Sequence, residues 1–357
     1  LRFVKEVIAD IRSKVGDFVV GLRISATEQD TTGIDESLAG DICQALDVTD
    51  GIDYFSLVTG TSASLGGSVH IAPPMAFEAA YVAPQAARIK SRVSKPVMIA
   101  GRFNQPKLAE QALSAGDADM CAMTRALICD PELPNKTKSG RAEDVRACIA
   151  CNQACIGHLH MGFPVSCIQH PETGRELLYG DLSKAAQSRH VMVVGGGPGG
   201  MKTAVVAAER GHHVTLYERS AHLGGQVALA QLLPGRAEFG GLVSNFSREL
   251  ELSGVEVIRK TTVDRELIEL QRPDVVVLAT GATPYRPAFE GRDEAHVVDA
   301  WQVIKGEVNI GTSVVIADWR CDWVGLGLAE KLARDGCRVR LCVNGNFAGE
   351  TIPQYVR

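Results

Sequence analysis

The strongest constraint on the fold is a glycine-rich turn within residues 191–219, VMVVGGGPGGMKTAVVAAERGHHVTLYER. An apolar strand-like run leads into Gly195-x-Gly197-x-x-Gly200, a helix-like segment follows, and a second apolar run ends at Glu218. This order of strand, glycine turn, helix and acidic residue predicts a Rossmann-like dinucleotide-binding fold. The glycines allow a tight turn and let a pyrophosphate reach the helix N-terminus, and Glu218 would accept hydrogen bonds from an adenosine ribose.

A second segment, residues 313–342, repeats the strand–helix–strand order without the glycines. Its turn reads DWRCD, so Asp318, Trp319 and Asp322 stand where a pyrophosphate would bind. Carboxylates repel a pyrophosphate, and an indole ring fills the space that it needs. We therefore predict a second, tandem Rossmann-like fold of the NAD type that has lost its nucleotide.

The first 135 or so residues alternate between helix-like and strand-like periodicity. Strand-like runs lie at residues 18–25, 53–60, 96–103 and 118–127, and we expect the first of them to be a buried strand. Four β-then-α units in succession require a parallel sheet, either doubly wound or closed into a barrel. Polar residues near consecutive strand ends meet at one face of a (β/α)8 barrel, so we expect its C-terminal half. These residues are Arg23, Thr59, Gly101, Arg102, Thr124 and Arg125.

Two of these strand ends resemble a phosphate site. Gly101 would permit a close approach of the backbone, and Arg102 and Arg125 offer planar guanidinium groups at the last two strands, where barrel enzymes commonly bind phosphate. The alternative is that each arginine forms an ion pair with a nearby acid at the rim of the barrel. Both arginines at corresponding positions favour phosphate.

Four cysteines fall within residues 148–167, CIACNQACIGHLHMGFPVSC. Cys148, Cys151 and Cys155 form a compact C-x2-C-x3-C triple, and Cys167 follows after eleven residues. Structural zinc usually takes two separated C-x2-C pairs, so this spacing favours a [4Fe–4S] cluster and leaves zinc as an alternative. The remaining cysteines lie singly, which is typical of a reducing compartment and makes disulfides the weakest reading. We expect these six to be buried structural thiols: Cys43, Cys121, Cys129, Cys321, Cys337 and Cys342.

The composition narrows the classes of partner. The 357 residues carry a net charge of −5 and no run of lysine or arginine, so we expect neither nucleic acid nor an anionic membrane as a partner. The longest apolar runs have the length of a strand and are far shorter than a membrane span. The chain opens without methionine and ends inside what reads as a domain, so we expect a piece of a longer cytoplasmic polypeptide.

Three motifs, in this order, resemble one family of enzymes. They are the strand ends GRF and TRALICDPELPNK, the cluster C-x2-C-N-Q-x-C with its fourth cysteine, and GGGPGG with ERSAHLGGQ. The sequence is similar over nearly its whole length to the multi-cofactor relatives of old yellow enzyme, which include 2,4-dienoyl-CoA reductase, trimethylamine dehydrogenase and the N-methylproline demethylases. The resemblance implies FMN in the barrel, a [4Fe–4S] cluster beside it, and FAD or ADP on the first dinucleotide fold.

The resemblance also implies roles for single residues. Arg23 would lie near the flavin ring, and Arg102 and Arg125 near the FMN phosphate, together with Gly101 and Thr124. The cluster ligands would be Cys148, Cys151, Cys155 and Cys167, and the residues lining the adenine nucleotide would be Gly195, Gly197, Gly200, Glu218, Gly225 and Gln226.

His70 is the titratable residue of the loop after the second strand, TSASLGGSVHIAPP. It is a candidate catalytic residue in contact with substrate. The alternative is a histidine at the rim of the barrel whose ring is satisfied by backbone groups.

Two departures from the reductase branch indicate the direction of electron flow. Dienoyl-CoA reductases would carry a Trp–His pair in the loop of His70, and this sequence lacks it, as it lacks the glycines of the second nucleotide fold. We therefore expect oxidative N-demethylation or dehydrogenation of a small N-methylated amine such as N-methylproline. Electrons would pass from FMN through the cluster to an external acceptor, which we expect to be an electron-transfer protein. The alternatives are an NAD(P)H-dependent 2,4-dienoyl-CoA or enoate reductase and a non-catalytic remnant that holds zinc.

These readings divide the chain into four segments. We expect residues 1–140 to be the second half of the FMN-binding barrel and residues 141–187 to carry the cluster. Residues 188–290 would bind FAD or ADP, and residues 291–357 would begin the degenerate second fold. We also expect a homo-oligomer.

Overall fold

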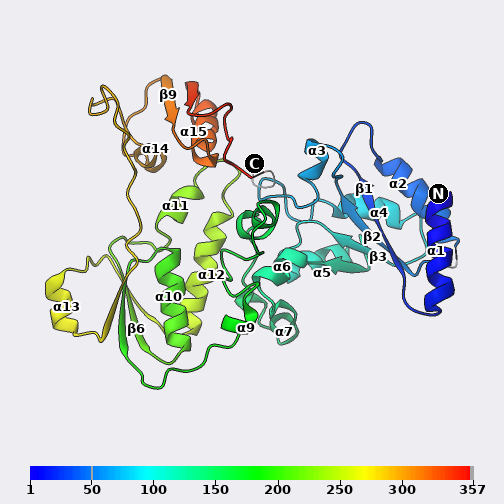
Figure 1. The fold of residues 1–357 in the computed structure, drawn as a ribbon, viewed down its shortest axis with the longest axis horizontal. Coiled ribbons are helices and arrows are strands. Elements are labelled where there is room, and N and C mark those ends of the chain that lie inside the picture. Colours follow the sequence, from blue (N-terminus) through cyan, green and yellow to red (C-terminus); the bar gives the residue numbers. More distant parts are fainter. Residues whose placement is uncertain (50, 354–357) are drawn as a thin grey trace. The chain divides into compact units, whose positions relative to one another are not determined.

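The computed structural model describes residues 1–49 and 51–353 and divides them into two compact units. Unit 1 comprises Leu1–Thr173 and unit 2 comprises Gly174–Pro353. Both combine parallel sheets with helices, which confirms the predicted α/β class (Figure 1). The expected cluster segment, 141–187, contributes residues to both units.

Unit 1 is built on a parallel sheet of four strands whose order, β1-β2-β3-β4, follows the chain. Each strand is joined to the next through a helical connection, as parallel neighbours require. This sequential order is the topology of part of a (β/α)8 barrel. The strands are β1 (Gly21–Thr27), β2 (Tyr54–Thr59), β3 (Val97–Ala100) and β4 (Met120–Ala122), and the longer helices are α1 (Arg2–Val15), α2 (Glu36–Asp47), α4 (Ala83–Lys90) and α5 (Pro106–Ser114).

The two faces of this sheet differ in what they contact. Phe55 and Leu57 of β2 pack into one apolar cluster with buried residues of α1, α2, α4 and α5, and Leu22 and Ile24 of β1 pack against the same cluster. Since successive residues of a strand point to opposite faces, Arg23 faces away from these helices. In a closed barrel this face is the interior.

The fourth strand is shorter than predicted. β4 ends at Ala122, and α6 (Thr124–Cys129) follows it, so Thr124 and Arg125 begin a helix rather than end a strand. The run TRALIC contains alanine, leucine and arginine, which are strong helix formers, and this explains why the apolar run splits.

The first strand also differs from the prediction. Arg23 is the third residue of β1, in register with Ser56 of β2, and does not stand at the strand end. The strand was expected to be buried, yet Ala26 alone among its seven residues is fully buried. The physical reason is that β1 is an edge strand of the sheet described here.

Unit 1 also contains several short helices and turns. Those that follow α6 alternate with irregular backbone, and the cysteine-rich segment lies there, as functional residues often do. These short helices and turns are α3 (Leu65–Ser68) after β2, then α7 (Leu133–Lys138), the 3₁₀ turn η1 (Ala142–Asp144), the π turn η2 (Gln153–Gly157) and α8 (His158–His160).

Unit 2 contains two parallel sheets. The larger has the strand order β7-β6-β5-β8, with a crossover on each side of β5, which is the arrangement of a Rossmann-like fold. The smaller pairs β9 with β10 in parallel. The strands are β5 (His190–Val194), β6 (His213–Glu218), β7 (Glu256–Arg259), β8 (Val275–Leu278), β9 (Ser313–Asp318) and β10 (Arg338–Val343).

The helices of unit 2 cover these sheets. The buried side of α10 includes Met201 and Val205, and β5 buries Met192 and Val193, so the predicted strand–turn–helix forms as expected. None of the described helices is long and apolar enough to cross a membrane. The helices are α9 (Glu176–Tyr179), α10 (Pro198–Glu209), α11 (Gln226–Ala230), α12 (Phe239–Leu252), α13 (Arg265–Gln271), α14 (Ala300–Lys305) and α15 (Trp323–Arg334).

Candidate functional site

The glycine turn between β5 and α10 has the stereochemistry that the motif predicts. Gly195 has a φ of +113°, and a Cβ there would lie 2.3 Å from the carbonyl oxygen of Ala279. A Cβ on Gly200 would lie 1.9 Å from the carbonyl oxygen of Gly195, so the helix can approach the turn only at a glycine. A Cβ on Gly197 would meet no protein atom within 4 Å. The open space therefore lies where a pyrophosphate would approach the backbone, and the turn fits such a group.

Glu218 closes this turn from the end of β6. Its Oε2 accepts a hydrogen bond from the backbone N–H of Gly196 at 2.7 Å, and its Oε1 accepts from the N–H and hydroxyl of Ser220 at 2.8 and 2.7 Å. Burial opposes ionisation of Glu218, but these hydrogen bonds outweigh it and lower the pKa of the carboxyl group. Oε2 accepts only the bond from Gly196 among those described and retains a second lone pair, so an ionised Glu218 can still accept from a ribose.

Two further predicted residues, Gly225 and Gln226, lie beside the glycine turn. Gly225 has a φ of +52°, and a Cβ there would lie 3.3 Å from the Cα of Gly197. Gln226 follows it and donates from Nε2 to the carbonyl oxygen of Ala282 at 3.4 Å, next to Gly281. The structure thus brings Gly225 and Gln226, which are distant in sequence from the first turn, to that turn.

The corresponding turn after β9 is already occupied by the chain itself. Asp318 Oδ1 accepts from the N–H groups of Arg320 and Cys321 at 3.1 and 2.9 Å, and Asp322 Oδ1 accepts from the N–H of Val324 at 2.9 Å. These are the donors that a pyrophosphate would need.

We predicted that Trp319 fills this turn, and the structure shows that it does not. Its ring stacks on Phe289 with centroids 5.9 Å apart and stays 47% exposed. Gly325 makes room for the carboxylate, because a Cβ there would lie 2.3 Å from Asp318 Oδ2. The two aspartates, and not the indole ring, therefore block pyrophosphate binding at this turn.

The four thiols of the cysteine segment converge in unit 1. All are free, and burial is the first cause that raises the pKa of Cys148, Cys151 and Cys155, in the case of Cys148 to about 11. In each of the six pairs among the four thiols, the charge of one thiol raises the pKa of the other. Yet among the described residues no three His, Cys, Asp or Glu side chains lie close enough to hold a single metal ion. Four soft thiolates are nevertheless the donor set that suits an iron–sulfur cluster or zinc.

Backbone N–H groups point at these sulfurs. The N–H of Ala150 donates to Cys148 Sγ at 3.4 Å, and backbone N–H groups act to lower the pKa of the other three thiols. The backbone reaches this arrangement by adopting a positive φ at two non-glycine residues, 48° at Ala150 and 56° at Asn152. N–H donors stabilise thiolates bound to iron, so the donor set also fits a cluster.

Arg125 connects the cysteine segment to the barrel sheet. It donates from one nitrogen to Pro73 O at 2.9 Å and to Asn152 Oδ1 at 2.6 Å, and Asn152 in turn donates to Ala72 O at 2.6 Å. Within the described part of the chain Arg125 makes no ion pair with a carboxylate, so the predicted alternative of an acid partner does not hold for it. Burial lowers the pKa of Arg125, while the thiols of Cys148 and Cys155 raise it.

Arg102 lies near Arg125 in the turn after β3. Its Nε and one terminal nitrogen donate to Phe77 O at 3.1 and 2.9 Å. Its positive charge also lowers the pKa of Arg125, by less than burial does. Gly101 has a φ of +156°, and a Cβ there would lie 2.3 Å from a methyl group of Val82. The glycine is thus required by packing on Val82. Two neighbouring guanidinium groups, one on the carbonyl of Phe77 and the other on those of Pro73 and Asn152, form a cationic site that fits a phosphate.

The ring of His70 contacts side chains, and not the backbone groups that the alternative reading required. Its Nδ1 lies 3.0 Å from the hydroxyl of Tyr81, which lies 2.9 Å from the hydroxyl of Thr59. The ring also packs edge-on against Phe77, with centroids 4.7 Å apart. Burial lowers the pKa of His70, so the neutral ring is favoured.

Tyr81 was missed by the sequence analysis. Burial raises its pKa, whereas a hydrogen bond with Thr59 and the charges of Arg125 and Arg102 lower it. Tyr81 therefore contacts His70 directly and is influenced by the charges of both arginines. No sequence signal separates this tyrosine from an ordinary core residue, because its partners are contributed by four different segments.

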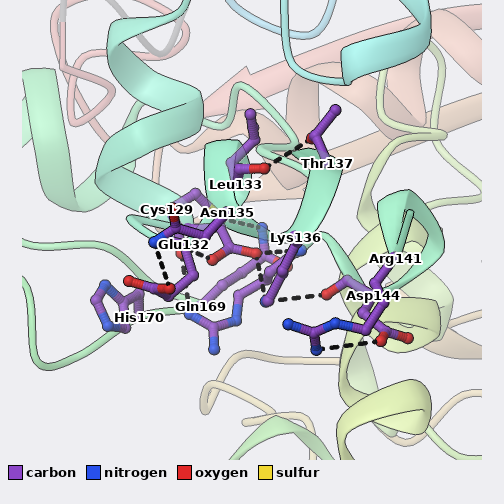
Figure 2. Close-up of polar contacts among 12 residues, drawn as sticks. Cys129, Glu132, Leu133, Asn135, Lys136, Thr137, Arg141, Asp144, Gln169 and His170 are labelled. Carbon is purple, nitrogen blue, oxygen red and sulfur yellow. Dashed lines mark hydrogen bonds and ion pairs between the residues drawn. The ribbon is translucent and has the colours of Figure 1, made fainter. Parts of the chain in front are cut away.

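The segment that leads into the cysteines is fixed by a buried ion pair (Figure 2). Lys136 Nζ lies 2.7 Å from Asp130 Oδ2, and the same nitrogen donates to Asp144 O at 3.0 Å. The Asp130 carboxylate is 2% exposed and also accepts from the N–H groups of Glu132 and Arg146. This network ends two residues before Cys148.

Replacing Lys136 with methionine should destabilise the protein by about 3–5 kcal/mol, because the Asp130 charge would stay buried without its cation. Urea unfolding of the holoenzyme measures the change. Lys138→Met is the matched control, since Lys138 is exposed on the same helix and should change stability by less than about 0.5 kcal/mol. Equal midpoints for the two variants would contradict the role of the ion pair.

Comparison with known proteins gives a consistent picture. Residues 1–144 match the model of the NADH:flavin oxidoreductase / NADH oxidase family, and residues 189–310 match that of pyridine nucleotide-disulphide oxidoreductase. The chain is 36% identical to "N,N-dimethylglycine/sarcosine dehydrogenase" of Chromohalobacter salexigens, a match covering 100% of the chain and 54% of that protein. It is 35% identical to "NADH oxidase" of Thermoanaerobacter brockii, covering 96% of the chain and 52% of that protein.

A solved structure agrees with both folds. That of 2-naphthoyl-CoA reductase in complex with 2-naphthoyl-CoA superposes with a TM-score of 0.91 at 30% identity, covering 99% of this chain and 53% of that one. The chain therefore spans about half the length of the relatives that it matches.

Proposed function

Because the chain belongs to the NADH:flavin oxidoreductase / NADH oxidase family, we propose that the protein oxidises a small N-methylated amine. An N-methylated amino acid is the best-supported class, since the relative from Chromohalobacter salexigens is named for N,N-dimethylglycine and sarcosine. N-methylproline remains a candidate of the same chemistry. The products would be the demethylated amine and formaldehyde, after water hydrolyses the imine.

Three sites in the chain fit the cofactors that this activity needs. Bound FMN would supply a two-electron acceptor, and a [4Fe–4S] cluster would carry single electrons onward. Arg102 and Arg125 would hold the FMN phosphate, and the four converging cysteines would hold the cluster. The glycine turn with Glu218 would hold an adenine nucleotide.

Arg23 would supply positive charge at the flavin. It stands on the face of the sheet opposite the helices, and its guanidinium group is exposed on that face. A fixed cation at this place favours negative charge on a neighbouring ring, and therefore favours acceptance of a hydride from a donor carbon. His70 is the candidate residue that can accept a proton, since burial favours its neutral ring.

The observation that carries the direction of the reaction is the turn after β9. Its N–H groups are taken by Asp318 and Asp322, so NADH or NADPH would have to displace two carboxylates and face their charge. A reductase needs that nicotinamide site as the source of its electrons, whereas an amine dehydrogenase does not.

Oxidised holoenzyme mixed with sarcosine, N,N-dimethylglycine or N-methylproline should lose its flavin absorbance within one turnover and release formaldehyde. NADPH should bleach the flavin at least about 100-fold more slowly, a difference of roughly 2.7 kcal/mol in the barrier. Stopped-flow absorbance and a formaldehyde assay measure both arms.

The alternative is an NAD(P)H-dependent enoate or 2,4-dienoyl-CoA reductase, which the similarity to the CoA reductase structure favours. Rapid bleaching by NADPH and turnover of an enoyl-CoA, with no response to any of the three amines, would establish that alternative and refute the amine reading.

A further inference from the structure

A chain of hydrogen bonds ends at the ring of His70. His70 and Tyr81 belong to one connection of unit 1, which runs from β2 to α4. The hydroxyl of Thr59, at the end of β2, lies 2.9 Å from the Tyr81 hydroxyl, which lies 3.0 Å from His70 Nδ1. The Thr59 hydroxyl also points at the backbone carbonyl oxygen of His70, at the longer distance of 3.5 Å. Thr59 is 3% exposed, so this end of the chain is shielded from water.

The backbone between His70 and Tyr81 is held by Arg102. Its side chain donates to the carbonyl oxygen of Phe77, and its own carbonyl oxygen accepts from the N–H of Ala80 at 3.2 Å. The ring of Phe77 lies 4.7 Å from the ring of His70 and 5.8 Å from that of Tyr81, measured between centroids. His70 and Tyr81 therefore meet on a segment that is anchored at its backbone and packed at its side chains.

Tyr81 engages one ring nitrogen of His70 and leaves the other available. Among the described residues, His70 Nε2 has no hydrogen-bond partner. The hydrogen bond at one ring nitrogen of a histidine sets the orientation of the ring and the role of its other nitrogen. The connection that carries His70 follows the carboxyl end of β2, and substrates of barrel enzymes bind at this end of the strands.

We propose that Tyr81, supported by Thr59, is a positioning residue that holds His70 so that Nε2 contacts the amine substrate. The inference rests on the proposed amine oxidation. An amine whose nitrogen carries a proton has no lone pair to assist the departure of a hydride, so that proton must leave first. Nε2 takes it: the N–H bond of the amine breaks, an Nε2–H bond forms, and no electrons are exchanged.

The hydrogen bonds of the network are kept when Nε2 takes up this proton. Nδ1 then donates to the Tyr81 hydroxyl, which donates to the hydroxyl of Thr59, which donates to the carbonyl oxygen of His70. A hydroxyl donates one hydrogen bond and accepts others, so each group of the network has a partner. The ring can therefore be protonated without turning away from the substrate.

The test is a double-mutant cycle on the full-length holoenzyme. Stopped-flow bleaching of the flavin by sarcosine, N,N-dimethylglycine or N-methylproline gives the limiting rate and, from its dependence on concentration, the Kd of the amine. Tyr81→Phe should lower the limiting rate about tenfold and change the Kd by less than about twofold. In a His70→Ala background Tyr81→Phe should lower the rate no further, because Tyr81 acts through His70.

Three further measurements separate positioning from a purely structural role. Thr59→Val should lower the limiting rate, and Thr59→Ser should restore it, because serine keeps the hydroxyl. Tyr54→Phe is the matched control, since the Tyr54 hydroxyl on β2 has no partner among the described residues, and it should change neither rate nor Kd. Urea unfolding needs no turnover: Tyr81→Phe should lower the midpoint more in the wild-type protein than in His70→Ala.

The outcomes separate this inference from the proposed function. No bleaching by any of the three amines in the wild-type protein overturns both. Bleaching that is equally fast in the wild-type, Tyr81→Phe and His70→Ala proteins overturns the inference alone. Losses that add in the double variant, or a Kd that rises as much as the rate falls, also overturn it, because Tyr81 then supports only the fold. If Tyr81→Phe does not fold, the two Thr59 variants decide: equal rates for valine and serine overturn the inference.

Discussion

Replacing Cys151 with serine should remove the iron from the protein, from about four atoms per chain to nearly none. Cys151 is one of the four half-buried thiols of the cysteine segment in unit 1, and a hydroxyl is a hard, weak ligand for a site that suits soft thiolates. Colorimetric iron analysis of protein purified without oxygen measures the loss, together with the disappearance of the brown colour.

Cys337→Ser provides the control for this variant. Cys337 is a half-buried thiol of unit 2 that donates to Gly311 O, and its loss should leave the iron content unchanged. One zinc per chain and no iron in the unaltered protein would show that the cysteines have the structural role that we set aside.

Replacing Gly197 with alanine should weaken binding of the adenine nucleotide about 100-fold, or roughly 2.7 kcal/mol, without lowering the stability of the apoprotein. The new Cβ would meet no protein atom within 4 Å and would enter the space that a pyrophosphate needs. The backbone at Gly197, with a φ of −77°, suits alanine as well as glycine. Isothermal titration with FAD and with ADP measures the affinity.

The two neighbouring glycines give the matched comparison. Gly200→Ala should destabilise the fold itself by about 3 kcal/mol or more, because its Cβ would lie 1.9 Å from Gly195 O. A Cβ at Gly199 would also meet no protein atom within 4 Å, and Gly199→Ala should leave both affinity and stability nearly unchanged. Equal nucleotide affinity in all three variants would mean that this turn does not bind a pyrophosphate.

The parts of the site that could be predicted from sequence depend on local stereochemistry. Glycine suits a backbone with positive φ and a close contact between a helix and a turn. The positions of Gly195 and Gly200 in the sequence therefore predict the geometry of the turn. The periodicity of apolar residues indicated the four βα units, because it shows which face of each helix or strand is buried. The limit appeared at β4, where an apolar run divides into a strand and a helix.

The sequence by itself therefore determined the α/β class, the order of the parallel strands in unit 1 and the turn that fits a dinucleotide. Only the tertiary structure decided which partners each polar side chain has: Asn152 with Arg125, Tyr81 with His70, and Gln169 with Cys129. The physical reason is that a hydrogen bond between side chains depends on a few ångströms of separation, which the packing of distant segments sets. The sequence shows which chemical groups each residue carries, and the tertiary structure determines which other residues those groups contact.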